Sequence, residues 1–136
     1  MTATEDHPRG DVTTRAEFHA RAASSSAAAM TRAMNLSAAG IAGLFALVTA
    51  QGFAPEVADR ALVTLAGVSF ALAIAAGIWN AYSDAQWSFY RAIGHREMDK
   101  WHARKGRSER ETLALFAVGA FLAALLLVRI VWSGWR

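Results

Sequence analysis

The chain has 136 residues, enough for one domain, and 54% of them are hydrophobic. It contains no cysteine, which excludes structural disulfides, thiolate chemistry and cysteine-ligated metal. The formal net charge is +3, with 14 Lys and Arg against 11 Asp and Glu, and the positions of these charges indicate membrane topology rather than nucleic-acid affinity.

Three stretches carry no charged residue and are rich in Ala, Leu, Val, Ile, Phe and Gly: 33–55, 61–83 and 112–128. The first two have 23 residues each and the third has 17, while about 20 apolar helical residues cross the hydrocarbon core. The third stretch lengthens if the guanidinium of Arg129 bends towards the interface. We therefore predict an all-α integral membrane protein with three transmembrane helices, an N-terminal polar helix and a basic amphipathic segment between spans two and three. The predicted spans are 35–54, 61–82 and 112–132.

The residues before the first span divide into two parts. Residues 1–13 are expected to be disordered, since proline and glycine interrupt any early order. Thr14 and Glu17 match a capping box, so a polar helix rich in small residues is predicted over 14–34. This helix packs on a neighbour, lies on the membrane surface or runs straight into the first span. The first 32 residues lack the apolar core of a signal peptide, so the first span is expected to act as an uncleaved insertion signal.

Small residues recur at four-residue spacing in all three predicted spans. In lipid, such residues let helix backbones approach closely, and this packing substitutes for the missing hydrophobic driving force. They serve either the bundle of one chain or an oligomer, and the sequence does not distinguish the two. The residues expected to pack helices together are Ala39, Gly43, Ser69, Ala73, Gly77, Ala81, Gly119 and Ala123.

The segment 84–111 holds seven Lys and Arg against five Asp and Glu. A basic amphipathic helix beside a membrane span is typical of an interfacial element that rests on anionic lipid. Two alternatives are a docking face for a partner protein and an outward continuation of span two, with Gly94 as a weak point. Aromatic rings at the predicted membrane boundaries favour the interfacial interpretation. The predicted lipid-interface residues are Trp79, Trp87, Tyr90, Trp101, Arg104, Lys105, Arg107 and Trp132.

The same segment contains the best candidate for a metal site. His95, Asp99 and His102 would share one face of a continuous helix, and imidazole with carboxylate suits divalent cations. No fourth ligand accompanies them, so no metal is predicted. The interleaved acids argue against nucleic-acid binding, and no histidine lies inside a span to hold a haem iron. Since no hydrolase triad, phosphate loop or zinc-protease motif is present, we predict neither enzyme activity nor a cofactor.

Positive charges predict the orientation of the chain. Eleven of the fourteen Lys and Arg residues precede the first predicted span or lie in 84–111. Lys and Arg are retained on the cytoplasmic side of a membrane. We therefore expect a multi-pass protein of the cell (inner) membrane, with the N-terminus and 84–111 in the cytoplasm and the C-terminus outside.

Two functions of different class are compatible with these features. The first is a small non-catalytic scaffold or accessory subunit, which packs with itself as a homo-oligomer or with a larger membrane complex. The second is an oligomeric pore-forming protein, such as a holin-like protein or a membrane-disrupting defence effector. The chain resembles three-span holins in element count alone, and its expected N-in, C-out topology is opposite to theirs, so no family is assigned.

Overall fold

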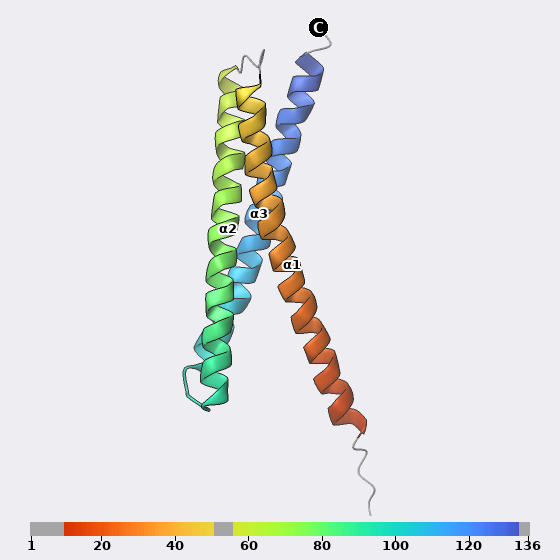
Figure 1. Cartoon of the computed structure of the whole chain (residues 1–136), viewed down its shortest axis with the longest axis vertical. Coiled ribbons are helices and arrows are strands. Elements are labelled where there is room, and N and C mark those ends of the chain that lie inside the picture. Colours follow the sequence, from red (N-terminus) through yellow and green to blue (C-terminus); the bar gives the residue numbers. More distant parts are fainter. Residues whose placement is uncertain (1–9, 51–55, 134–136) are drawn as a thin grey trace, which may run out of the picture.

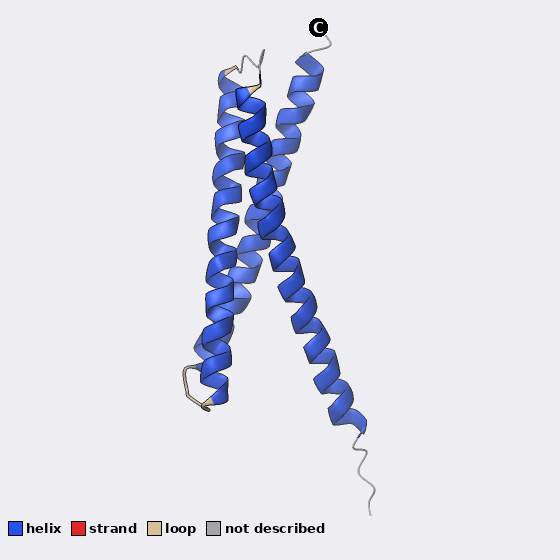
Figure 2. Cartoon of the chain, in the orientation of Figure 1, coloured by secondary structure: helices blue, strands red, loops and turns tan. Residues whose placement is uncertain are grey.

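The chain forms three long helices and, within the residues described, no strand. The computed structural model describes residues 10–50 and 56–133. In it α1 comprises Gly10–Thr49, α2 Val57–Ala92 and α3 Met98–Ser133 (Figures 1 and 2). Each helix is long and apolar enough to cross a membrane. The predicted all-α class with three membrane-spanning helices is confirmed.

Helix α1 unites two elements that were predicted separately. It runs without a break through both 14–34 and the described part of 35–54, so the polar helix continues straight into the first span. It also begins at Gly10, so Thr14 lies inside the helix instead of at its start, and residues 10–13 are helical where disorder was predicted. Residues 1–9 lie outside the described part of the chain.

The segment 84–111 is not a separate surface helix. Span two continues outward to Ala92, and α3 begins at Met98. At the end of α2, Gly94 has a φ of +64°, a conformation that glycine adopts without steric cost. The His95 N–H donates to the Tyr90 carbonyl at 3.0 Å and the Gly94 N–H to the Arg91 carbonyl at 3.3 Å, which is a Schellman C-cap. The weak point at Gly94 therefore ends the helix and reverses the chain.

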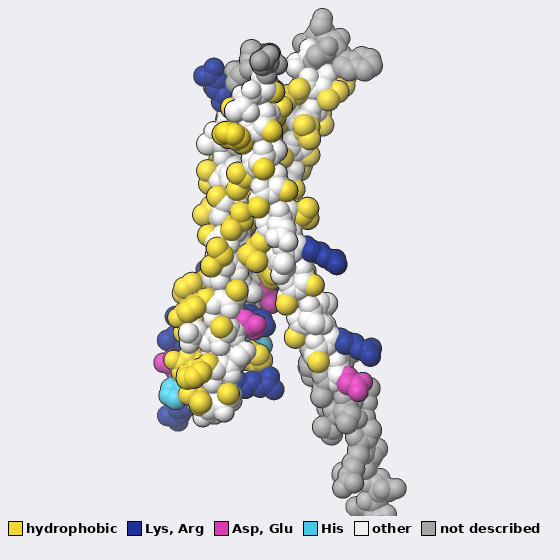
Figure 3. Space-filling view, viewed as in Figure 1, with side chains coloured by type: hydrophobic (Ala, Val, Ile, Leu, Met, Phe, Trp, Pro, Cys, Tyr) yellow, Lys and Arg dark blue, Asp and Glu magenta, His cyan; other side chains and the backbone are white. Residues whose placement is uncertain are grey.

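The three helices pack with their apolar portions together and their charged portions at one end. Helices α2 and α3 form an antiparallel hairpin, and α1 lies beside α2 in its C-terminal half while its N-terminal part diverges (Figure 1). Helices of 36 residues are about 54 Å long, whereas the hydrocarbon core is about 30 Å thick. Charged side chains gather on the end that holds the α2–α3 turn, and further ones lie on the N-terminal half of α1 (Figure 3). This end extends well beyond the apolar portion.

The other end of the bundle is tied together by Arg129. Its Nε donates to Asp59 Oδ1 at 2.8 Å and its Nη2 to Glu56 Oε2 at 3.2 Å. The guanidinium thus reaches the start of α2, where the predicted span has not yet begun. A cation at the boundary of the third span is compensated by two carboxylates there.

Candidate functional site

The centre of the bundle is a phenylalanine held between two glycines. Phe70 of α2 is 3% exposed. A Cβ atom built on Gly40 of α1 would lie 2.6 Å from Cε2 of this ring, and one built on Gly119 of α3 would lie 2.8 Å from Cδ1 and Cε1. Only glycine at these two positions lets the ring fit between the helices. Leu44, Ala66 and Leu126 complete this core.

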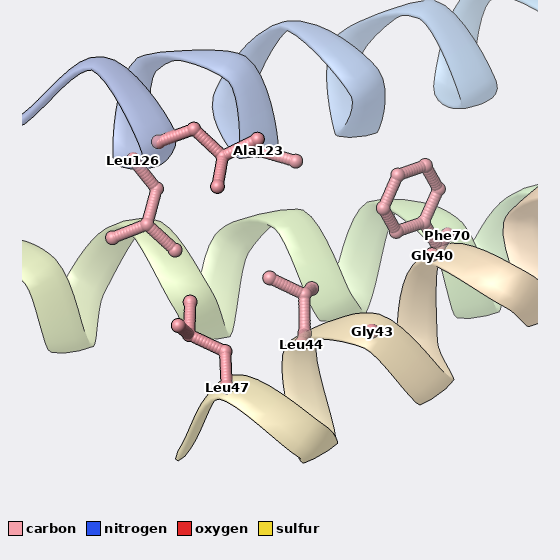
Figure 4. Close-up of a pocket in the computed structure, with 8 residues that line it drawn as sticks. Gly40, Gly43, Leu44, Leu47, Phe70, Ala123 and Leu126 are labelled. Carbon is pink, nitrogen blue, oxygen red and sulfur yellow. The ribbon is translucent and has the colours of Figure 1, made fainter. Parts of the chain in front are cut away.

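An apolar groove opens beside this core, between α1 and α3. Its volume is about 450 Å³. Figure 4 shows side chains of α1 and α3 facing one another across it, with Phe70 of α2 at one end. The Cβ position of Gly43 meets no atom within 4 Å, so the α1 backbone is open there. The groove is lined by Gly40, Gly43, Leu44, Leu47, Phe70, Ala123, Leu126 and Leu127.

The predicted small residues divide into inward-facing and outward-facing positions. Ala73, Gly77 and Gly119 are buried between helices, Ser69 and Ala123 are half-buried, and Ala39, Gly43 and Ala81 are exposed. At the two ends of the ladder in span two, Ser69 is half-buried and Ala81 is exposed. Their exposure differs because each step of four residues rotates the side-chain direction about 40° beyond a full turn of the helix.

The buried side of α2 follows steps of four and three instead: Ala66, Phe70, Ala73, Gly77, Asn80 and Ser83. The average step is close to 3.5 residues, which keeps one seam facing the neighbouring helices, as in a left-handed coiled coil. Of the residues in the predicted four-residue ladder, only Ala73 and Gly77 belong to this buried seam. Gly40 was missed because no small residue four positions away marked it.

Aromatic rings tie the charged ends of α2 and α3 together. Tyr90 stacks on Trp101 with centroids 6.4 Å apart, and Tyr82 meets the edge of the same indole at 5.8 Å. Trp87 lies 5.7 Å from His102 and is flanked by two cations. Trp87, Tyr90 and Trp101 are half-buried where the two helices face each other. Tyr82 and Trp79 are each 48% exposed, and Trp132 is 69% exposed.

The three cations predicted at the lipid interface differ in their surroundings. Arg104 lies 4.8 Å from the centroid of Trp101 and is exposed. Lys105 is half-buried and pairs with Asp84 across the hairpin at 2.5 Å. Arg107 is exposed and pairs with Glu111 one turn away at 2.8 Å. Lys105 therefore links helices, and the two arginines face outward.

A buried polar layer separates the apolar and charged portions of the bundle. The amide of Asn80 donates to the Lys105 carbonyl and to Ser108 Oγ, both at 3.1 Å. The Thr112 hydroxyl donates a hydrogen bond to the Ser108 carbonyl at 2.8 Å, and the Ser26 hydroxyl of α1 donates to Glu109 Oε1 at 2.7 Å. The one sequence signal for this layer is an asparagine near the end of a charge-free stretch, because polar groups in lipid need a partner.

Replacing Asn80 with alanine is expected to lower the free energy of unfolding by about 1 kcal/mol, since hydrogen bonds between membrane helices contribute about 0.6 to 1.7 kcal/mol. Ser83 supplies the matched control. Its hydroxyl is buried and has no hydrogen-bond partner among the described residues, so Ser83→Ala is expected to leave stability equal or higher. Unfolding by SDS in mixed micelles measures both. An equal loss in the two variants would contradict a role for the Asn80 amide.

The candidate metal residues do not share a helix face. His95 lies in the turn between α2 and α3, whereas Asp99 and His102 belong to α3. The interruption removes the common face on which their spacing depended. Within residues 10–50 and 56–133, no three His, Asp or Glu side chains are grouped as metal ligands.

Comparisons with known proteins do not assign the chain to a family. No protein-family model matches it, and neither a curated protein nor a solved structure does.

Proposed function

We propose that this chain is a non-catalytic scaffold or accessory subunit of the cell (inner) membrane, which packs with a second copy of itself through the groove between α1 and α3. The observation that carries the proposal is the groove itself, where the open backbone at Gly43 adjoins a wall of leucines. The alternative within this class is packing against a larger membrane complex through the same face.

Physical chemistry favours a helix as the occupant of this groove. Lipid tails are as apolar as leucine, so helices associate in membranes where their backbones can approach closely. Ala39 and Gly43 are four residues apart on α1 and both are exposed. They provide such a place beside the groove, whereas large side chains such as Phe45 and Phe121 cover much of the remaining apolar surface.

A pore-forming assembly receives less support from the side chains. A water-filled pore formed by several copies of the chain needs polar groups on the helix faces that line its lumen. Ser37, Asn80 and Thr112 are instead buried within one chain. The exposed hydroxyls of Thr49 and Thr64 bond carbonyls of their own helices. Asn35 is exposed, but it lies at the very start of the first predicted span, so the described middle portions of the spans offer few free polar groups to a lumen.

We also propose that the charged end of the bundle lies in the cytoplasm, among anionic headgroups. Its support is the excess of Lys and Arg at that end. Each such cation near an anionic surface contributes about 1 kcal/mol of attraction. The C-terminus would then lie on the opposite side of the membrane.

Cysteine cross-linking tests self-association without background, because the chain has no cysteine. A Gly43→Cys variant in native membranes is expected to form a disulfide-linked dimer under mild oxidation, because the Cβ of Gly43 faces open space in the groove. Gly67→Cys is the matched control, since its Cβ also meets no atom within 4 Å but it does not line the groove. Gel electrophoresis without reductant measures the dimer.

Two results would contradict the proposal. Equal cross-linking at both positions would indicate random collision. Absence of a dimer at Gly43, together with recovery of no membrane protein in a mild-detergent pull-down, would exclude both forms of the scaffold. A membrane-potential dye should report an unchanged potential at the expression level that gives the dimer, and a collapse would favour the pore instead.

A further inference from the structure

A second hollow lies on the outer surface of the hairpin, at the edge of the charged end. Its volume is about 320 Å³, and it is lined by Trp79, Arg104, Arg107, Ser108 and Glu111. We propose that this pocket binds the phosphodiester headgroup of one anionic glycerophospholipid. The proposal names a specific site within the headgroup contact proposed above, and it rests on that contact.

The position of the pocket along the helices matches headgroup level. Trp79 lies near the end of the charge-free stretch 61–83 of α2, and Glu111 directly precedes the charge-free stretch 112–128 of α3. Both walls of the pocket therefore lie where the surface changes from apolar to charged. An exposed indole at such a boundary is typical of the aromatic belt of membrane proteins.

The charge of the pocket suits a single phosphodiester. Two arginines line it against one carboxylate, which leaves one positive charge uncompensated. Arg107 uses its Nε to bind Glu111, so its terminal N–H groups remain for a ligand. Arg104 forms no salt bridge with any described residue. Arginine suits phosphate because its planar guanidinium donates two parallel hydrogen bonds.

Neighbouring aromatic rings restrict the position of the Arg104 guanidinium. Its guanidinium lies 4.8 Å from the ring centroid of Trp101, and that indole is itself packed against Tyr82 and Tyr90. A guanidinium over an aromatic face loses less freedom on binding than one that extends freely into water.

The surface beside the pocket suits an acyl chain. Leu72 lies two helical turns deeper than Trp79 on α2, and Val118 lies two turns deeper than Glu111 on α3. Both side chains are 50% exposed. A lipid whose phosphate occupies the pocket would therefore place its tail on an apolar surface of the same two helices.

Native mass spectrometry of the full chain in detergent tests this proposal, with phosphatidylglycerol, phosphatidylcholine and inorganic phosphate as probes. Phosphatidylglycerol is expected to bind best. The double variant R104Q/R107Q should weaken its binding on the order of 10-fold or more. The control R96Q/R110Q removes the same charge from exposed positions outside the pocket and should have little effect.

The outcomes separate the site from the general contact. An equal loss in the two double variants would overturn the pocket but leave the attraction of the basic end to anionic lipid. No preference of the unaltered chain for phosphatidylglycerol over phosphatidylcholine would overturn both. Retention of inorganic phosphate at the same concentration would assign the pocket to a soluble phosphate compound and overturn the lipid. Circular dichroism of each variant verifies that its helices are retained.

Discussion

Replacing Gly119 with alanine is expected to lower the free energy of unfolding by about 1 to 3 kcal/mol, the usual cost of overpacking a close-fitting core. The new methyl group would lie 2.8 Å from two carbons of the Phe70 ring. The ring cannot move away from it, because Gly40 on the opposite helix is already in close contact with the other edge of the ring. The strain must then separate α3 from α2 or rotate the ring out of its place.

Gly67 supplies the matched control for this prediction. A Cβ atom there meets nothing within 4 Å, and alanine has a helix propensity up to about 1 kcal/mol better than glycine. Gly67→Ala should therefore be neutral or stabilising. SDS titration in mixed micelles, followed by circular dichroism, compares the two variants. If Gly119→Ala were as stable as Gly67→Ala, the close contact of Phe70 with Gly119 would not exist in the membrane.

A second substitution tests whether the ring causes the loss. Phe70→Leu removes the carbons that the new methyl group would meet, so it should cost less in the Gly119→Ala background than in the unaltered chain. Residues in contact are expected to be coupled by about 0.5 to 3 kcal/mol. Simple additivity of the two substitutions would show that Gly119→Ala acts elsewhere.

Replacing Arg104, Lys105, Arg107 and Arg110 with glutamine is expected to let part of the population insert with the 93–97 turn outside. These residues are four of the seven cations in 84–111, and cations near a span retain that side in the cytoplasm. Alkaline phosphatase fused after Arg110 is active only outside the cytoplasm. Its activity should therefore rise from background in this variant.

The matched control keeps the charge and changes only its chemistry. With lysine at Arg104, Arg107 and Arg110, the fusion should stay inactive, because lysine and arginine act alike in setting topology. An inactive fusion in the glutamine variant would mean that the remaining cations suffice and that these four do not set the orientation. Activity in the unaltered chain would reverse the proposed orientation altogether.

The sequence by itself determined that three helices of this chain are long and apolar enough to cross a membrane. A charge-free stretch inside a bilayer has no water to which its backbone N–H and C=O groups can hydrogen-bond. In lipid, a single apolar segment satisfies these groups by forming a helix. The absence of cysteine and the uneven placement of Lys and Arg are likewise read directly from the residues. None of these conclusions depends on which helix face meets which.

Only the tertiary structure decided the partners of individual side chains. Gly40 and Gly119 are 79 positions apart and owe their importance to one ring on a third helix. The inward seam of α2 follows steps of four and three residues, which the four-residue ladder did not reproduce. Trp101 stacks with Tyr90 because a Schellman turn at Gly94 reverses the chain between them. Hydropathy measures how strongly a residue prefers an apolar environment to water. In a membrane, lipid and a neighbouring helix are both apolar environments, so hydropathy does not distinguish between them. The choice between them depends on close packing, which is a property of pairs of residues.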